Sequence, residues 1–340
     1  MNMEINSLIK KTEELIKNIK SVNPDITHIQ PHHAPLIAQI VSNYNLKQAP
    51  LGTIPEAQMI FLGAPTGAGK DTLNRKIELE NKNTNFVTLN MDMFRHYHNE
   101  VIGSDAFISD EEYAKVTNQT SYELYYIIQE LILREFPGTN IIITGTMRDL
   151  DWIQEIADRY RYDKRTKYKL SLATLAVSTK ESALSIFERY LRMVDTRDLS
   201  SNAPLRYTDL KYHGDSIKRF TDNVMFMEKD LHQNPNNSYF SSIKVYRRSK
   251  DITDYSEDTL VFDSDNPDPH MCAHSHILNI MNTEPNFDPK RVYELLEIIK
   301  RNSDYLKKQG LYESIITNIK NIVTKPKEIS KLPDDDNEEK

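Results

Sequence analysis

The stretch from Phe61 to Thr72 reads FLGAPTGAGKDT, and it contains three of the nine glycines in the 340-residue chain. The apolar run from Met59 to Leu62 indicates a buried strand, whereas the stretch from Leu73 to Leu79 indicates a helix. In a glycine-rich turn between a strand and a helix, main-chain N–H groups and a lysine ammonium can surround phosphate oxygens. The stretch therefore predicts a phosphate-binding loop, with an ordinary strand-to-helix turn as the alternative.

The predicted loop departs at two positions from the usual pattern, G-x-x-x-x-G-K-[ST]. Ala64 replaces the first glycine, although Gly63 lies directly before it. Asp71 replaces the hydroxyl residue that normally follows the lysine and binds Mg²⁺, so either Thr72 or the Asp71 carboxylate is expected to hold the ion. The residues expected to bind the nucleotide are Gly63, Ala64, Pro65, Thr66, Gly67, Ala68, Gly69, Lys70, Asp71 and Thr72.

Strand-like and helical segments alternate between about residues 56 and 265, which predicts an α/β fold. The expected strands are 59–63, 86–90, 140–145, 168–177, 243–247 and 259–262, and the expected helices are 72–80, 119–135, 180–194 and 206–232. This order favours a parallel sheet with helices on both faces, in which the ligand lies at the carboxyl ends of the strands.

Composition indicates a soluble globular protein. Hydrophobic residues make up 39% of the chain and charged residues 27%, which suffices for a buried core beneath a solvated surface. The net charge of −7 argues against general nucleic-acid binding, because the phosphate backbone requires clustered positive charge. We therefore expect no general nucleic-acid partner, although a local basic pocket is compatible with this net charge.

Two features bear on the location of the protein. The single cysteine, Cys272, excludes an intrachain disulfide framework and suits a reducing compartment. The N-terminus lacks the pattern of a secretion signal, and no apolar run is long enough to span a bilayer. We expect a cytoplasmic protein without membrane contact, and delivery into another cell is compatible with the same features.

An acidic residue follows the second expected strand. Asp92 lies just after this strand, and Arg95 lies one helical turn further on. A carboxylate at this place lies near the γ-phosphate, where a kinase needs a base for the incoming hydroxyl. The alternative is that Asp92 is only the N-cap of the next helix.

The third expected strand ends in Thr144, Thr146 and Arg148, and two more arginines, Arg189 and Arg206, lie on expected helices. Guanidinium groups suit the charge that develops on a phosphoryl group during transfer. The alternatives are a plain turn with a hydroxyl cap for the first group and solvated surface positions for the two arginines.

Five motifs together resemble the zeta toxins, which are kinases of bacterial toxin–antitoxin systems. They are GAPTGAGK, NMDMFRHYH, ITGTMR, FERYLRM and LRYTDLKYH, within residues 55 to 250. The resemblance implies a P-loop kinase fold and ATP-dependent phosphorylation of a UDP-N-acetyl sugar, with Mg²⁺ as cofactor and an antitoxin protein as partner. It further implies that Lys70 holds the ATP phosphates, that Asp92 is the base, and that Arg189 and Arg206 stabilise the transferring group.

Two positions depart from the family pattern. Thr144 stands where the family usually has a glutamate that helps to hold the sugar, and Asn99 stands where proline is common. A hydroxyl does not replace the charge-assisted hydrogen bonds of a carboxylate, so a polynucleotide end, a protein side chain or an antibiotic stays an alternative acceptor. A nucleotide-binding regulatory module without turnover is the alternative of another class. The residues expected to bind the acceptor are Arg95, His98, Thr144, Thr146 and Arg148.

The resemblance, the helical patterning of both ends and the composition of the tail together divide the chain into four expected regions. They are a helical N-terminal extension (1–54), the kinase domain (55–265), a C-terminal helical region (266–326) and a disordered acidic tail (327–340). We expect the amphipathic helix at 4–22 to pack its apolar stripe on the kinase core. The cluster HMCAHSH at 270–276 offers soft metal ligands, but its spacing favours a polar surface loop over a zinc site.

Overall fold

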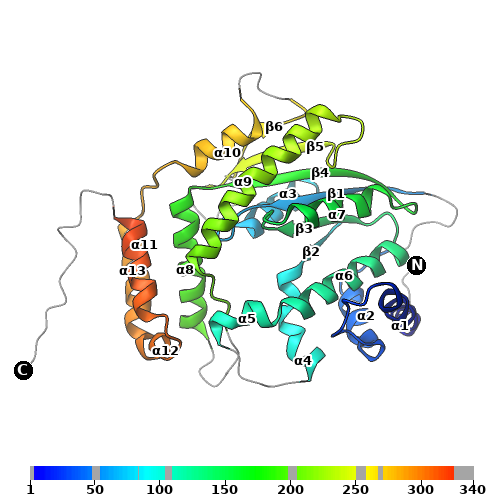
Figure 1. Ribbon diagram of the computed structural model, residues 1–340, viewed down its shortest axis with the longest axis horizontal. Coiled ribbons are helices and arrows are strands. Elements are labelled where there is room, and N and C mark those ends of the chain that lie inside the picture. The colour runs from blue at the N-terminus through cyan, green and yellow to red at the C-terminus, as the bar shows by residue number, and fades with distance from the viewer. Residues whose placement is uncertain are drawn as a thin grey trace, which may run out of the picture.

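The computed structural model describes residues 4–47, 54–82, 84–103, 109–197, 205–249, 258–266 and 271–324. These ranges fold around a six-stranded sheet of order β2-β3-β1-β4-β5-β6 with helices on both faces (Figure 1). The strands are β1 (Glu56–Gly63), β2 (Phe86–Asn90), β3 (Asn140–Gly145), β4 (Lys167–Ala176), β5 (Ser242–Arg247) and β6 (Thr259–Asp263).

The first five strands are parallel, and β6 is antiparallel to β5. The predicted α/β fold is therefore confirmed, whereas the expectation that the last strand is also parallel is wrong. The stretch between Arg247 and Thr259 is shorter than the dozen or so residues that a parallel crossover needs. The carboxyl ends of the five parallel strands share one edge of the sheet, which is where the phosphate loop leaves β1.

Neighbouring residues of β1 point to opposite faces of the sheet, because side chains alternate along a strand. Phe61 lies in the larger core with Ile143 and Leu172, beneath α6 (Asn118–Glu135), α7 (Leu150–Arg161) and α9 (Leu210–Gln233). Leu62 lies in a smaller core beneath α3 (Lys70–Glu80), where it is grouped with Leu73. Burial on both faces explains why the central strands read as continuous apolar runs.

The N-terminal helices α1 (Ile5–Val22) and α2 (Ala34–Ser42) are joined through the 3₁₀ turn η1 (Pro31–His33) and pack against α6. The buried side chains of α1 belong to the same hydrophobic core as β1 and β3, so the predicted docking of this helix on the core is confirmed. Figure 1 shows both helices, in dark blue, at the opposite side of the molecule from the C-terminal helices.

The C-terminal helices form a second hydrophobic cluster on α8 (Thr179–Thr196). These helices are α11 (Pro289–Arg301), α12 (Ser303–Lys308) and α13 (Tyr312–Val323). Leu295 and Ile315 lie in this cluster with Phe187 of α8. No helix in the described ranges has the length and apolar character needed to cross a membrane.

Several elements were not among those expected from the sequence. They are the 3₁₀ helix η2 (Met91–Tyr97), α4 (His98–Ile102), α5 (Asp110–Val116), α7 and α10 (Ala273–Met281). Because α10 begins at Ala273, the expected surface loop is wrong for residues 273–276, while His270 lies outside the described residues. The expected disordered tail at 327–340 also lies outside the described residues. Across the residues that the structure describes, no cluster of three or more acidic, histidine or cysteine side chains could hold a metal ion.

Candidate active site

The phosphate loop requires glycine at two positions. Gly67 and Gly69 have φ angles of 81° and 92°, in the left-handed region that other residues rarely adopt. A Cβ atom on Gly67 would lie 2.2 Å from the main-chain oxygen of Ser182 on α8. Within the described residues, the N–H groups of Thr66, Gly67 and Gly69 donate to no protein acceptor. A loop with free donors at the start of α3 suits phosphate oxygens.

A steric contact also explains the glycine at position 63, one residue before the usual first glycine of the motif. A Cβ atom on Gly63 would lie 2.2 Å from Sδ of Met147, which follows β3. Met147 has a φ angle of 52°, and its carbonyl accepts a 2.7 Å hydrogen bond from Asn223 on α9. The methionine is thus held over the end of β1. Glycine is needed at 63 for this contact, while Ala64 fits the buried next position.

Asp92 lies between two arginines just beyond β2. Its Oδ1 accepts a hydrogen bond of 2.9 Å from Nε of Arg95, and its Oδ2 forms an ion pair with Arg206. The N-cap of η2 is Asn90, whose side chain accepts the N–H of Asp92. The alternative in which Asp92 is only a cap is therefore wrong, and its carboxylate is oriented by guanidinium groups.

These arginines determine the charge state of Asp92. Burial by itself would raise the pKa of the carboxyl, but Arg206 and Arg95 outweigh burial and hold the pKa well below its usual range. Arg95 is itself buried, and its N–H groups also donate to the Ala114 carbonyl, Thr117 and Asn118. Because these partners occupy the Arg95 donors, Arg95 orients Asp92, and the role of acceptor-binding residue fits it poorly.

Lys70 and Arg189 complete a cluster of positive charge around Asp92. Burial lowers the pKa of the Lys70 ammonium, while the nearby carboxylates Asp92 and Asp71 act in the opposite direction. Burial and the charge of Arg206 likewise lower the pKa of Arg189, which reaches from α8 to the Thr208 hydroxyl at 3.4 Å. Four cations, Lys70, Arg95, Arg189 and Arg206, thus surround one carboxylate beside the phosphate loop.

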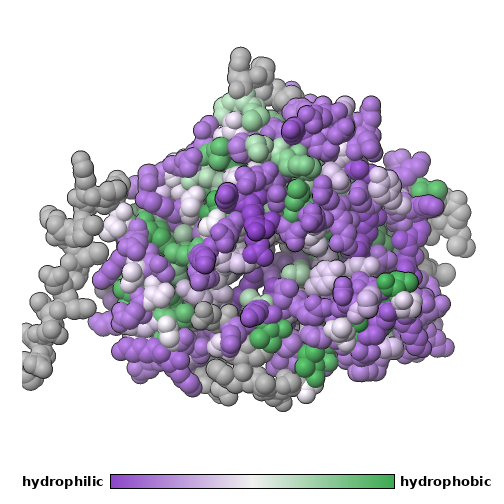
Figure 2. All heavy atoms as spheres, viewed as in Figure 1, coloured by the Kyte–Doolittle hydropathy of each residue, from purple (hydrophilic) through white to green (hydrophobic). Residues whose placement is uncertain are grey.

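Arg206 reaches this cluster from an unexpected backbone position. Helix α9 begins only at Leu210, with Asp209 as its N-cap, so the expected helix start at 206 is wrong. Arg206 lies in the segment without regular secondary structure before α9, while Arg189 lies within α8. Figure 2 shows a hollow bordered by hydrophilic side chains near the centre of this face, between the region of α8 and α9 and that of α5 and α6.

The two candidates for Mg²⁺ differ in their surroundings. The Thr72 hydroxyl donates a 2.6 Å hydrogen bond to the Gly69 carbonyl, whereas Asp71 is exposed on the first turn of α3. The Asp71 carboxylate raises the pKa of both Lys70 and Arg189 against the effect of burial, so it lies near the cationic cluster. Both residues stay candidates for a metal ion bound with phosphate, because a hydroxyl that donates its hydrogen keeps oxygen lone pairs for a cation.

The predicted acceptor residues lie in different surroundings. Thr144 is on β3 next to β1, and its hydroxyl oxygen is buried without a hydrogen-bond partner in the described structure. Thr146 lies two residues further on, and Arg148 stacks on the Tyr212 ring at 4.3 Å. The alternative in which a hydroxyl caps the next helix is wrong, because Asp149 caps α7.

His98 is occupied by contacts with the N-terminal extension. Its Nδ1 lies 2.9 Å from the Thr120 hydroxyl, which also lies 2.8 Å from Nδ1 of His28. Burial and the neighbouring His28 lower the pKa of His98, so it is neutral at pH 7. His98 therefore helps to join α4, α6 and the N-terminal extension.

The sequence analysis did not identify Arg248, which binds the main chain of the phosphate loop. Its guanidinium donates to the carbonyls of Gly67 at 3.0 Å and Ala68 at 3.4 Å, and pairs with Glu181 of α8 at 2.8 Å. Arg291 of α11 pairs with the same Glu181. The available signal was the place of Arg248 directly after β5, at the edge of the sheet where ligands bind.

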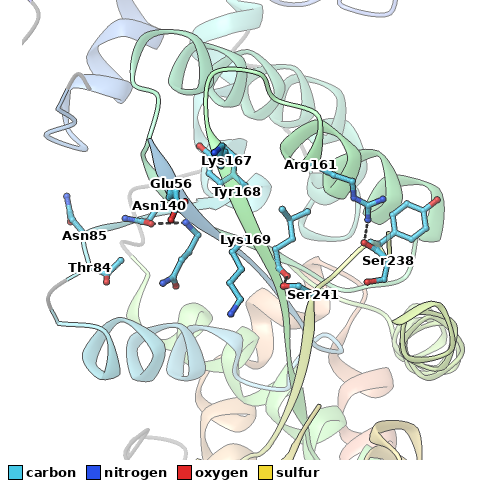
Figure 3. A pocket seen from close by; sticks show the side chains of 14 residues that line it. Glu56, Thr84, Asn85, Asn140, Arg161, Lys167, Tyr168, Lys169, Ser238 and Ser241 are labelled. Atoms are coloured by element: carbon cyan, nitrogen blue, oxygen red, sulfur yellow. Dashed lines mark hydrogen bonds between the residues drawn. The ribbon is translucent and has the colours of Figure 1, made fainter. Parts of the chain in front are cut away.

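A solvent-open hollow of about 720 Å³ lies at the amino ends of the strands, opposite the end of the sheet that carries the phosphate loop (Figure 3). It is lined by residues at the amino ends of the strands, among them Glu56, Asn140 and Lys169. None of the predicted site residues lines it. Parallel α/β sheets bind ligands at the carboxyl ends of their strands, so this hollow is separate from the candidate active site.

Comparison with known proteins agrees with this geometry. The sequence model of the zeta toxin family matches residues 47–259. A structure from the PezAT chromosomal toxin–antitoxin system of Streptococcus pneumoniae is similar, with a TM-score of 0.54 and 18% identity over 84% of this chain and 97% of that one. The AvrRxo1-ORF1:AvrRxo1-ORF2 complex with sulphate ions has a TM-score of 0.49 and 11% identity, over 86% and 89% of the two chains. No curated protein matches this chain in sequence.

The phosphate loop at the carboxyl edge of a largely parallel sheet, together with the family match, makes this protein an ATP-dependent phosphotransferase of the P-loop kinase class. The family match covers more than half of the chain. The protein therefore belongs to the zeta toxin family, as its sequence motifs suggest.

Proposed function

We propose that this enzyme transfers the γ-phosphoryl group of Mg²⁺-ATP to a hydroxyl of a small acceptor, with a UDP-N-acetyl sugar as the favoured substrate. The observation that carries the proposal is the convergence of Lys70, Arg189 and Arg206 on Asp92 beside the phosphate loop. A site that gathers cations around one carboxylate suits phosphoryl transfer, which depends mainly on positioning and charge stabilisation.

The phosphate loop would hold the donor. The N–H groups of Thr66, Gly67 and Gly69, which have no acceptor among the described residues, would donate hydrogen bonds to phosphate oxygens, and Lys70 would add its charge. The exposed Asp71 carboxylate is a hard oxygen ligand beside the loop, so the residues present fit Mg²⁺ bound with the nucleotide. When bound, the ion would neutralise charge on the phosphates.

Asp92 would receive the proton of the acceptor. The hydroxyl oxygen forms a bond to the γ-phosphorus while the bond to the bridging oxygen breaks, so ADP leaves and the hydroxyl proton passes to Asp92. Arg189 and Arg206 would bind the equatorial oxygens of the transferring group, where charge is redistributed in the transition state. Arg95 would keep Asp92 oriented during the reaction.

The acceptor is inferred from the family resemblance and from Thr144. Family membership favours a UDP-N-acetyl sugar, but the usual carboxylate is replaced by the buried, unpartnered Thr144 hydroxyl. A buried hydroxyl without a partner retains a donor and an acceptor for a ligand. A change from carboxylate to hydroxyl favours an acceptor that needs fewer charge-assisted hydrogen bonds at this point.

We further propose a protein antitoxin as the partner and the bacterial cytoplasm as the location. Both proposals rest on membership of the zeta toxin family. The cationic cluster would be a natural target for an inhibitory partner, since any segment that covers it would exclude ATP. Co-purification of the tagged chain with the product of an adjacent gene would test this partner.

The proposed activity is tested by incubating the protein with γ-labelled ATP, Mg²⁺ and a panel of UDP-sugars, followed by mass spectrometry of the acceptors. A gain of one phosphate on a UDP-N-acetyl sugar supports the proposal. Separate reactions contain an oligonucleotide, a peptide mixture or an aminoglycoside, and transfer to one of these alone would replace the proposed acceptor. Absence of ATP turnover with every acceptor and with water would leave the regulatory-module reading.

Matched arginine variants of α8 separate site chemistry from general loss of charge. Arg189→Ala should lower kcat by roughly 10²–10⁴-fold, as removal of transition-state charge stabilisation does. Arg192→Ala is the control, because Arg192 lies on the same helix with its side chain 56% exposed. Equal rates for the two variants would contradict the proposed role of Arg189.

A further inference from the structure

Asp110, the first residue of α5, is a buried carboxylate at the junction of four segments. It is only 1% exposed. Its Oδ2 accepts hydrogen bonds from the hydroxyls of Tyr190 on α8 at 2.7 Å and Tyr305 on α12 at 2.6 Å. Its Oδ1 accepts the N–H of Leu205 at 2.6 Å. A buried carboxylate without such partners would be costly, so these contacts specify one arrangement of the four segments.

The contacts of Asp110 lie on both sides of Arg206. The Leu205 N–H donates to the side chain of Asp110, and the Tyr207 N–H donates to its main-chain carbonyl at 3.4 Å. Arg206 is therefore held between two hydrogen bonds to a single residue. Because Arg206 precedes α9, no helical hydrogen bonds fix its backbone, and Asp110 supplies the fixed points.

Aromatic packing reinforces the same junction. The rings of Tyr190 and Tyr207 meet edge to face, with centroids 5.2 Å apart. The Arg197 guanidinium lies 3.4 Å from the centroid of the Tyr305 ring. Helix α5 also carries Tyr113, whose pKa is raised by burial and influenced by Arg95, Arg206 and Asp92. The helix that begins at Asp110 thus borders the cationic cluster.

We propose that Asp110 is a positioning residue that fixes Arg206 against Asp92, and that the hydroxyls of Tyr190 and Tyr305 keep the Asp110 carboxylate oriented. The proposal rests on the proposed function, since it gives Arg206 its role in phosphoryl transfer. Through Tyr305, the C-terminal helices contribute to the geometry of the active site. A displacement of about 1 Å in a catalytic group can cost roughly 10²-fold in rate, so this support matters for catalysis.

Hydrogen exchange tests the positioning without reference to activity. In nucleotide-free protein, the Leu205 N–H should be protected in the wild type and should exchange faster in Asp110→Ala, which removes its acceptor. Asp110→Asn should lie between the two, because the amide oxygen can still accept this N–H. The control is Glu112→Gln, an exposed carboxylate of the same helix. Unchanged exchange at Leu205 in both Asp110 variants would overturn the proposal.

Kinetics test whether Asp110 acts through Arg206. With Mg²⁺-ATP, and with water or UDP-N-acetylglucosamine as acceptor, Asp110→Ala should lower kcat by about 10–100-fold while KM for ATP changes little. Asp110→Asn should recover part of the rate. In an Arg206→Ala background, Asp110→Ala should cause no further loss, because the residue it positions is already absent.

The outcomes distinguish the two proposals. A normal kcat in Asp110→Ala, or the same fold loss in the Arg206→Ala background, would overturn the positioning role while leaving the kinase activity in place. If the wild type fails to turn over ATP, the proposed function fails, and the exchange at Leu205 still decides whether Asp110 holds the Arg206 segment. Should Asp110→Ala fail to fold, Asp110→Asn carries both measurements.

Discussion

The Arg206 guanidinium forms an ion pair with the Asp92 carboxylate, so two groups proposed for catalysis neutralise each other in the nucleotide-free protein. A bound γ-phosphate would compete with Asp92 for Arg206. If Arg206 moved to the phosphate, Asp92 would lose one of the two cations that hold its pKa down and would become a better proton acceptor. The pair therefore links phosphate binding to the strength of the base.

Replacement of Asp92 by asparagine tests this base. Asp92→Asn should retain ATP affinity but lower phosphoryl transfer by roughly 10²–10⁴-fold, because asparagine keeps the shape of the side chain and takes up no proton. Single-turnover transfer and ATP binding should be measured together. Asp151→Asn, at an exposed position on α7, is the control. Near-normal transfer in Asp92→Asn would show that the carboxylate only orients its arginines.

Replacement of Lys70 tests the binding of ATP, the phosphoryl donor. Lys70→Ala should abolish ATP binding or turnover while the fold stays intact, since the lysine projects at the phosphate loop and is not part of the hydrophobic cores. Calorimetry with ATP and circular dichroism would follow the two properties. Arg75→Ala removes an exposed cation from the same helix and should bind ATP normally. Equal ATP affinity in wild type and Lys70→Ala would refute the assignment.

Arg247 and Arg248, at the end of β5, allow a test of whether Arg248 maintains the shape of the phosphate loop. Arg248→Lys should raise KM for ATP by about tenfold or more, because a lysine cannot reproduce the fork of hydrogen bonds to Gly67, Ala68 and Glu181. The neighbouring Arg247→Lys changes an exposed side chain and should have no effect. A similar KM in the two variants would mean that the loop keeps its shape without Arg248.

The parts of the site that sequence could predict are those coded locally. The glycines and Lys70 lie within one short motif, and Asp92 follows directly from the end of a strand. The five parallel strands follow from their apolar runs, since burial on both faces leaves a continuous signal. The direction of β6 could not be predicted in this way, because hydrophobic periodicity carries no information on strand polarity.

The parts that sequence could not predict depend on contacts between distant segments. Asp110 meets Tyr305 across 195 residues, and Arg248 meets Gly67 across 181 residues. Neither residue carries a local pattern that distinguishes it from a surface aspartate or arginine. Helix α7 is a different case, because its buried positions Ile153, Ile156, Ala157 and Tyr160 follow helical spacing and were available in the sequence.

The carboxylate of Glu123 provides a test of stability and its pH dependence. Burial would raise its pKa, but hydrogen bonds from the N–H groups of Ile29, Thr27 and His28 and from Gln119 outweigh burial and lower it. A lowered pKa stabilises the folded state at pH values above the ordinary value of 4.5, and this stabilisation is lost as the pH falls through the folded value. Glu123→Gln should cost about 1–3 kcal/mol at pH 7.

The difference in free energy of unfolding between wild type and Glu123→Gln should shrink as the pH is lowered from about 4.5, because both side chains are then uncharged. Urea unfolding at a series of pH values would measure it. Glu100→Gln, at an exposed position on α4, is the control. A difference that stays constant down to acid pH would exclude a contribution from ionisation of Glu123.

Deletion of residues 1 to 48 separates a structural from an inhibitory role of the N-terminal extension. We expect the truncated protein to aggregate or to unfold more easily, because α1 and α2 share the core of the sheet and Glu123 would lose the three N–H donors of residues 27–29. The extension packs on α6, away from α8 (Figure 1). Tighter ATP binding and faster turnover in a folded truncation would instead reveal autoinhibition.

The contact between Gly63 and Met147 has an evolutionary consequence. Sδ of Met147 occupies the space that a Cβ atom at 63 would need, so a larger residue at 63 requires Met147 to shift or to be replaced by a smaller residue. The last residue of β1 and a residue just after β3 are therefore expected to vary together. A lineage in which Met147 is replaced by a smaller residue would therefore be free to carry a larger residue at position 63.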